Sequence, residues 1–149
     1  MVPGLAPATI PAMDSLHRAD LPKRAELTAA LERELGQQPR VVFAYLHGSF
    51  LTEPAFHDID VAVYLDAPRE ALTALCVDLA ERLSRVAGLP FDVRPLNEAP
   101  VPFRFHAMRG RVLLSRDDER LADLLERTIR EYLDIEPLLR RATIEAFAR

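Results

Sequence analysis

Two short apolar runs in the first half of the chain constrain its fold more than any other feature. Residues 40–46 are Arg-Val-Val-Phe-Ala-Tyr-Leu and residues 59–65 are Ile-Asp-Val-Ala-Val-Tyr-Leu. Both runs are rich in β-branched and aromatic residues and are too short for a typical helix, so each predicts a buried β-strand. Residues 91–95 are short and extended, and residues 111–114 are a last strand candidate. The sequence therefore predicts a sheet of three or four strands.

Segments with helical periodicity surround these strands. Apolar residues recur at spacings of three and four over residues 23–35, and again from Pro68 to Gly88. A Pro-bounded segment spans residues 101–108, and the pattern is helical from Asp117 to the end. We expect a kink near Pro137, or a new helix starting close by, because proline removes a helical hydrogen bond. This order predicts an α/β or α+β fold, with a mixed sheet backed by helices and a C-terminal helical segment.

Length and composition predict one domain preceded by a tail. A chain of 149 residues with 49% hydrophobic content can bury a substantial core. Residues 1–22 contain four prolines and lack the basic start and continuous apolar stretch of a signal peptide. We expect a flexible Pro-rich N-terminal tail over residues 1–22 and a single domain over residues 23–149. The one cysteine, Cys76, lies on the apolar face of a predicted helix, where we expect it to fill the core.

The acidic balance of the chain limits its partners. The formal net charge is −4 and the isoelectric point is about 5.6. Such a chain has no overall electrostatic attraction to nucleic acid or to an anionic membrane. No apolar run approaches the roughly 18 residues that span a bilayer. We therefore expect a cytoplasmic protein that binds neither nucleic acid nor membrane directly.

Three aspartates are the candidate metal ligands. Asp58 and Asp60 are two positions apart at the start of the second strand, so both side chains project to one side of the sheet. Asp92 would reach the same place if its strand pairs beside the second strand. Mg²⁺ prefers oxygen ligands and is commonly held by one or two carboxylates together with substrate phosphates. Because three clustered carboxylates repel one another unless cations lie between them, the pattern predicts a site for a pair of Mg²⁺ ions.

A glycine and a serine at the end of the first strand complete the candidate site. Gly48 and Ser49 precede the aspartate pair, and a turn that contains glycine lets backbone N–H groups and a hydroxyl approach phosphate oxygens. Two metal ions can activate an attacking hydroxyl and stabilise a leaving pyrophosphate. The sequence therefore predicts nucleotidyl transfer, with the triphosphate at Gly48 and Ser49.

Each of these residues also has a purely structural interpretation. An Asp-x-Asp pair is expected about once by chance in this chain, and Asp58 and Asp60 could be solvated residues at a strand start. Asp92 could be a surface charge on an edge strand. Gly48 could serve only a tight turn and Ser49 only a helix cap. The combination of Gly-Ser with the downstream pair favours the functional interpretation.

Four further polar residues are candidates for roles in the site. His47 and His57 flank the loop, but two histidines without a matching third ligand more often make local hydrogen bonds than bind zinc. Arg104 and Arg109 could contact ATP phosphates or a partner protein. Arginines on a helix surface are usually solvated charges, and we expect that of both.

These motifs together resemble a known group. Residues 45–50 (Tyr-Leu-His-Gly-Ser-Phe) and 58–65 (Asp-Ile-Asp-Val-Ala-Val-Tyr-Leu) resemble the signature of the polymerase-beta-like nucleotidyltransferase superfamily. The resemblance is to its shortest members, the minimal nucleotidyltransferases (MNT) that pair with HEPN-domain ribonuclease toxins. It extends through residues 91–93, 111–114 and 130–134, and covers roughly residues 23 to 140. The loop departs from the family pattern, with Glu53-Pro54 and His57 where members often carry a small residue and a serine.

The resemblance implies a nucleotidyltransferase fold and an antitoxin that transfers AMP from ATP to a tyrosine hydroxyl of its toxin. Asp58 and Asp60 would be metal ligands, Asp92 the third carboxylate, and Gly48 and Ser49 would hold the phosphates. The implied cofactor is Mg²⁺, the substrate ATP, and the partner a cognate HEPN toxin in a hetero-oligomeric complex. One alternative is a non-catalytic antitoxin that occludes its toxin. Another is a small-molecule nucleotidyltransferase of the aminoglycoside type, which the short chain disfavours.

Overall fold

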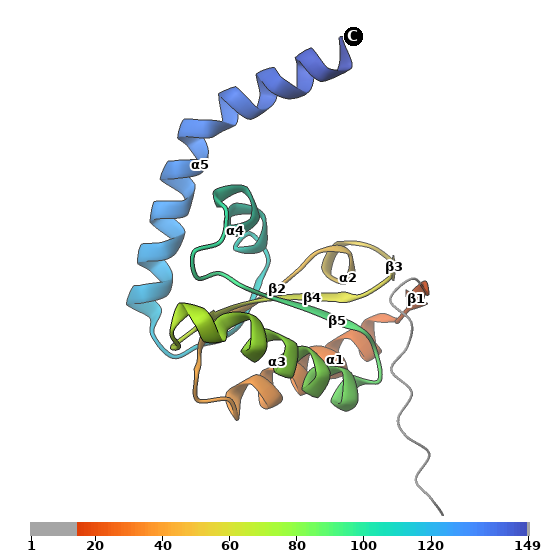
Figure 1. Cartoon of the computed structure of the whole chain (residues 1–149). Helices are drawn as coiled ribbons and strands as arrows, with labels where there is room; N and C mark the ends of the chain where they lie inside the picture. The colour runs from red at the N-terminus through yellow and green to blue at the C-terminus, as the bar shows by residue number, and fades with distance from the viewer. Residues whose placement is uncertain (1–14, 149) are drawn as a thin grey trace, which may run out of the picture.

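A four-stranded mixed sheet forms the centre of the protein, whose computed structural model describes residues 15–148 (Figure 1). The strands lie in the order β5-β4-β2-β6. β4 pairs antiparallel with β2 and parallel with β5, and β2 also pairs antiparallel with β6. The bounds are β2 (Val41–His47), β4 (Ile59–Leu65), β5 (Phe91–Pro95) and β6 (Arg111–Ser115). The predicted mixed sheet of three or four strands is confirmed.

Helices cover both faces of this sheet (Figure 1). Strand side chains alternate between faces, and β2 shows the result: Ala44 and Leu46 join one buried cluster, whereas Phe43 and Tyr45 join the other. The larger cluster lies under helices α1 (Leu21–Gly36) and α3 (Leu72–Ala87). The smaller one lies under α4 (Val101–Ala107) and the first part of α5 (Asp118–Phe147). The aspartates of interest project to this second, less completely covered face.

The long helices begin and end where local chemistry dictates. Asp20 caps α1 by accepting a hydrogen bond from the backbone N–H of Lys23 at 2.9 Å, and Pro22 occupies the first turn. A short 3₁₀ turn, η1 (Arg69–Ala71), precedes α3, which ends at Gly88 in the left-handed conformation (φ +69°). The helices predicted over residues 23–35 and 68–88 are therefore present, and Cys76 lies in the core as expected.

Three short elements lie outside the sequence-based expectation. Helix α2 (Ser49–Thr52) follows β2, and the two-residue strands β1 (His17–Arg18) and β3 (Ala55–Phe56) pair antiparallel. β1 and the start of α1 both fall within the range expected to be a tail. Most of that range, residues 1–14, lies outside the described residues.

The last helix, α5, is continuous through Pro137. Of the two expected alternatives, the kink is present as a bend of the helix axis (Figure 1), and no new helix starts there. Proline removes one hydrogen bond and crowds the preceding turn, which bends a helix without ending it. Leu124 and Thr128 are buried in the first part, but every described residue from Pro137 onward is exposed. None of the helices within residues 15–148 is long and apolar enough to cross a membrane.

Candidate active site

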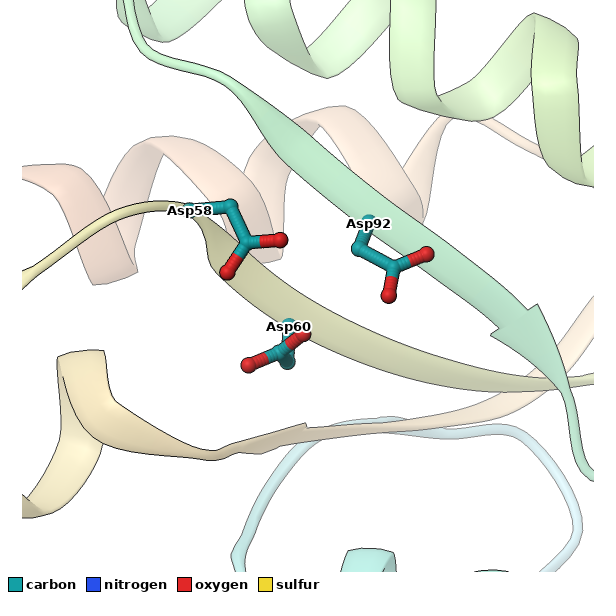
Figure 2. A group of neighbouring side chains, drawn as sticks. All are labelled: Asp58, Asp60 and Asp92. Atoms are coloured by element: carbon teal, nitrogen blue, oxygen red, sulfur yellow. The ribbon is translucent and has the colours of Figure 1, made fainter. Parts of the chain in front are cut away.

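Three carboxylates meet where strands β4 and β5 begin, on the less covered face of the sheet (Figure 2). Asp58 directly precedes β4, Asp60 lies within it, and Asp92 lies in β5. Asp60 and Asp92 are register partners in the parallel pair, so their side chains share one face. One oxygen from each of the three residues lies within 4.8 Å of the others, and each side chain is half-buried. The structure thus brings together the three predicted ligands, while their binding of metal remains a prediction.

Buried neighbours on the opposite face fix the direction of these side chains. Ile59 and Val61 flank Asp60 in β4 and are fully buried in the cluster under α1 and α3. Because strand side chains alternate, burying these two residues forces Asp60 to the other face. Phe91 and Val93 do the same for Asp92 in β5. The apolar pattern that builds the core therefore also aims the carboxylates.

Burial and neighbouring negative charge raise the pKa values of Asp58 and Asp60. Burial, and then the charges of Asp58 and Asp92, raise the pKa of Asp60 to about 6. Burial and then Asp92 also raise the pKa of Asp58. Arg94 opposes these shifts, and its Nε lies 3.1 Å from Oδ2 of Asp92. One arginine offsets only part of three negative charges, so this set of oxygen donors fits a pair of divalent cations such as Mg²⁺.

Gly48 packs directly against one of the carboxylates. Its φ of +78° and ψ of −163° form a backbone conformation that only glycine adopts readily. A Cβ atom at this position would lie 2.2 Å from Oδ2 of Asp60, a separation that no real side chain tolerates. Gly48 therefore lies beside Asp60, and Ser49 follows it as the first residue of α2. Their role in holding phosphates remains a prediction.

Arg24 holds the loop that follows Gly48 and Ser49, a role that sequence reasoning missed. Its guanidinium donates hydrogen bonds to the carbonyl of Phe50 and to the carbonyls of Glu53 (2.8 Å) and Pro54 (2.9 Å). It also lies over the rings of Phe50 and Phe56, at 4.9 and 5.4 Å from their centroids. In the sequence, Arg24 is one of several charged residues on an amphipathic helix, and no pattern distinguishes it.

The two histidines beside the loop form no metal site with other ligands. Within residues 15–148, the aspartates are the only group of three potential ligand side chains close enough to share an ion. His47 lies edge-on to the ring of Phe103, with centroids 5.7 Å apart. Burial, opposed by Asp92, lowers the pKa of His47. This half-buried histidine is therefore mainly neutral at pH 7 and adds little positive charge to the site.

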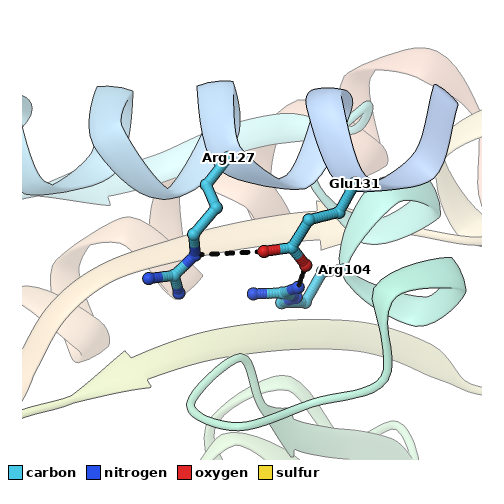
Figure 3. Close-up of polar contacts among 3 residues, drawn as sticks. All are labelled: Arg104, Arg127 and Glu131. Carbon is cyan, nitrogen blue, oxygen red and sulfur yellow. Dashed lines mark hydrogen bonds and ion pairs between the residues drawn. The ribbon is translucent and has the colours of Figure 1, made fainter. Parts of the chain in front are cut away.

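The two arginines of α4 and its following turn have different surroundings. The expectation that Arg104 is a solvated surface charge is wrong, because its side chain is only 7% exposed. It donates to Oε2 of Glu131 in α5 at 2.7 Å, and Arg127 approaches the other carboxylate oxygen at 3.7 Å (Figure 3). Arg104 thus joins α4 to α5 and is unavailable to a nucleotide. Arg109, in contrast, is exposed beside Gly48.

A family comparison agrees with this geometry. The family model described as polymerase beta, nucleotidyltransferase matches residues 30–119, a span that contains Gly48, Ser49 and the three aspartates. The chain belongs to the polymerase beta nucleotidyltransferase family. The predicted resemblance to this superfamily is therefore confirmed, and the aspartate triad lies in a nucleotidyltransferase domain. Comparison with curated protein sequences finds no match.

Solved structures share the fold of this nucleotidyltransferase over most of its length. One is a chain of the complex of tri-AMPylated Shewanella oneidensis HEPN toxin with MNT antitoxin, with 19% identity and a TM-score of 0.60, covering 82% of this chain and 99% of that one. A chain of the toxin-antitoxin MntA-HepT has 18% sequence identity and a TM-score of 0.60, and the match covers 87% of this chain and 100% of that one. A chain of a toxin-antitoxin with AMP-PNP has 21% sequence identity and a TM-score of 0.60, and the match covers 83% of this chain and 98% of that one. At these identities the likeness establishes the fold.

Proposed function

We propose that this protein is an MNT antitoxin that transfers AMP from ATP to a tyrosine hydroxyl of a cognate HEPN ribonuclease toxin and thereby neutralises it. The observation that carries the proposal is the convergence of Asp58, Asp60 and Asp92 within 4.8 Å in a polymerase beta nucleotidyltransferase domain. Structures with the same fold support it, since they include a tri-AMPylated HEPN toxin with its MNT antitoxin and a complex with AMP-PNP.

In the proposed reaction the tyrosine oxygen attacks the α-phosphorus of ATP. The bond from that phosphorus to the oxygen bridging to the β-phosphate breaks, pyrophosphate leaves, and AMP stays on the tyrosine through the new P–O bond. Asp58, Asp60 and Asp92 would hold Mg²⁺, which supplies neutralisation of the phosphate charge and polarisation of the attacking hydroxyl. Asp92 accepts the tyrosine proton, and Gly48 and Ser49 hold phosphate oxygens through backbone N–H groups and the hydroxyl.

The exposed apolar side chains of α5 are consistent with the binding of a protein partner. Large apolar side chains on this helix face solvent, among them Leu133 (65% exposed), Ile144 (61%) and Phe147 (86%). Exposed apolar stripes of this kind commonly mark protein interaction sites. The acceptor tyrosine belongs to the toxin in this proposal, so the two proteins must form a complex before transfer.

The decisive test is transfer of label to the toxin. The protein is incubated with ATP labelled on the α-phosphate, Mg²⁺ and its co-encoded toxin, and the toxin is analysed for label and for the modified tyrosine. We expect AMP on the toxin with the wild-type protein and none with the Asp58→Asn/Asp60→Asn variant. An unlabelled toxin, when an established AMP transferase labels its own substrate in parallel, would refute catalysis.

A second candidate function is neutralisation by binding alone, which the exposed apolar end of α5 favours. The same double variant separates the two functions, because it removes two carboxylates while leaving α5 intact. If cells that express the toxin with the double variant grow as well as cells with the wild-type protein, occlusion is sufficient. If they do not grow and the variant still binds the toxin, neutralisation requires transfer.

A further inference from the structure

Arg94 is the one basic side chain that forms an ion pair with any of the three aspartates, within the part of the chain that the structure describes. Its Nε lies 3.1 Å from Oδ2 of Asp92. The two residues are two positions apart in β5, so their side chains project to the same face of the sheet. A single guanidinium is therefore the only positive charge that the described residues place in contact with this cluster of carboxylates.

The neighbours of Arg94 add no second positive charge. Its guanidinium carbon lies 5.6 Å from the ring centroid of Phe103, a residue of α4. The same ring packs against His47, whose pKa is lowered by burial. In β4 the register partner of Arg94 is Ala62. None of these three side chains is a cation at pH 7, so Arg94 alone balances charge at Asp92.

The contact with Arg94 conflicts with the work proposed for Asp92. A carboxylate that coordinates Mg²⁺ at about 2.0–2.1 Å uses an oxygen lone pair, and accepting a proton requires another. The Nε–H of Arg94 engages the same carboxylate and places a positive charge beside the incoming ion. Two positive charges at this separation repel each other. Arg94 and a bound Mg²⁺ therefore compete for Asp92.

Arg94 can leave this position without disturbing the fold. Its side chain is 61% exposed and that of Asp92 is 31% exposed. An ion pair so accessible to water contributes little to stability. Arg104 is the contrasting case, because its guanidinium is buried between α4 and α5 and is held by Glu131. Displacement of Arg94 from Asp92 therefore requires no change in the packing of the domain.

We infer that Arg94 takes the place of a cation at Asp92 in the metal-free protein and is displaced when Mg²⁺ binds, so that it lowers the affinity of the site for free Mg²⁺. The inference rests on the proposed function, because it takes Asp92 as a metal ligand. Phosphate oxygens of ATP would add further ligands, so Mg²⁺ that arrives with the nucleotide overcomes this competition more readily than Mg²⁺ alone. Arg94 is thus a positioning residue that acts through Asp92.

Calorimetric titration of the full-length protein with Mg²⁺ at pH 8, without nucleotide, tests the inference. The variants are Arg94→Gln, which removes the charge, and Arg94→Lys, which keeps it. Arg69→Gln is the matched control, because Arg69 is an exposed arginine paired with Glu98 at 3.2 Å, and both residues follow the other ends of β4 and β5. A parallel titration uses α,β-methylene-ATP in Mg²⁺. This nucleotide resists transfer, because a methylene group replaces the bridging oxygen at which the bond would break.

We expect Arg94→Gln to lower the Kd of Mg²⁺ about threefold or more, because a positive charge beside the ion is removed. Arg94→Lys and Arg69→Gln should stay within about twofold of the wild-type protein. A purely structural role for Arg94 predicts the opposite sign, since damage to the site weakens metal binding.

An unchanged or raised Kd of Mg²⁺ in Arg94→Gln overturns the inference, as does an equal fall in Arg94→Lys or Arg69→Gln. If the wild-type protein binds neither Mg²⁺ nor α,β-methylene-ATP, the proposed function fails together with the inference. If the wild-type protein binds both and Arg94→Gln binds Mg²⁺ no more tightly, the inference alone fails.

Discussion

The ionised carboxylate of Asp60, the form that would bind a metal ion, destabilises the metal-free folded protein. Its pKa is raised from 3.8 to about 6, so the folded state binds this proton more tightly than the unfolded state does. The contribution of Asp60 to stability therefore falls as pH rises from about 4 to about 6, and stays low above that. We expect Asp60→Asn to raise the Tm of metal-free protein at pH 8 by about 4 °C, and by little at pH 4.

Thermal melts with and without Mg²⁺ check this prediction. Asp66→Asn is the control, since Asp66 is an exposed aspartate at the far end of the same strand. Mg²⁺ should raise the Tm of the wild-type protein, because an ion that binds only the folded state stabilises it. The gain should be much smaller for Asp60→Asn. A variant that melts below the wild-type protein at pH 8 without metal would mean that Asp60 stabilises the fold, contrary to this argument.

Gly48 supports a second prediction at the residue scale. Gly48→Ala would place a methyl group 2.2 Å from Oδ2 of Asp60 on a backbone with φ of +78°. We expect a loss of about 1–3 kcal/mol in the free energy of unfolding, together with weaker Mg²⁺ binding because Asp60 must move. Urea unfolding and metal titration measure the two effects. Gly36→Ala is the control, because no atom lies within 4 Å of a Cβ there, and it should cost little.

The sequence predicted some of these residues and not others for a physical reason. Asp58 and Asp60 could be predicted to share one face because strand alternation is a local property. The meeting of Asp92 with them depended on the pairing of β5 with β4, which the sequence left as a condition and the structure supplies. Arg24 and Arg104 could not be placed in this way, since their environments depend on distant partners. Arg104 is buried because Glu131, 27 positions later, lies against it. Neither residue differs from a solvated helix arginine in its own neighbourhood.

At the scale of elements, the loop after Gly48 depends on helix α1. Arg24 binds three carbonyls of the loop and packs on two of its rings, so removing it leaves those groups without partners. We expect Arg24→Ala to cost about 2 kcal/mol in the free energy of unfolding and to speed proteolysis within residues 50–57. Arg24→Lys should restore little, because a single ammonium cannot reach the same set of acceptors.

Urea unfolding and limited proteolysis with mapped cleavage sites measure these effects. Arg33→Ala is a suitable control, because Arg33 is an exposed residue on the same helix. Cleavage within residues 50–57 at the wild-type rate in Arg24→Ala would show that the loop holds its conformation without this arginine. The atypical residues Glu53 and Pro54 would then not depend on α1, and the role given to Arg24 would be withdrawn.

Elements with a strong period were predictable, and the shortest ones were not. The runs at residues 40–46 and 59–65 became β2 and β4 with bounds shifted by one residue or not at all. β1 and β3 have two residues each, too few to display an alternation, and they exist only because they pair with each other. Helix α2 has four residues and depends on the turn at Gly48. Such elements are set by tertiary contacts rather than by a repeating pattern.

At the scale of the whole molecule, α5 divides into a docked part and a free part. The docked part buries Leu124 and Thr128 and is tied to α4 by Arg104 and Glu131. The free part begins at Pro137, and its ion pair between Arg140 and Glu136 is an exposed pair within one helix. Such pairs contribute only a few tenths of a kcal/mol. The sequence showed an apolar pattern along the whole helix but not where the contact with the domain stops.

Removing the residues after Glu136 should therefore separate folding from partner binding. Because every described residue from Pro137 onward is exposed, we expect the truncated chain to change Tm by less than about 3 °C and to bind α,β-methylene-ATP as the full chain does. It should lose binding to the toxin, since Ile144 and Phe147 are gone. A full-length chain with Ile144→Ser and Phe147→Ser tests the same surface without shortening the helix.

These two variants distinguish a surface effect from a loss of helix length, because the serine variant keeps the helix and removes only its apolar side chains. If both lose toxin binding and keep nucleotide binding, AMP transfer must fail for want of the acceptor, although Asp58, Asp60 and Asp92 are unchanged. Calorimetry with nucleotide, toxin pull-down and the label transfer assay would report this pattern together. If both variants bind the toxin with wild-type affinity, the partner surface lies on the domain itself, and the exposed stripe on α5 has another role.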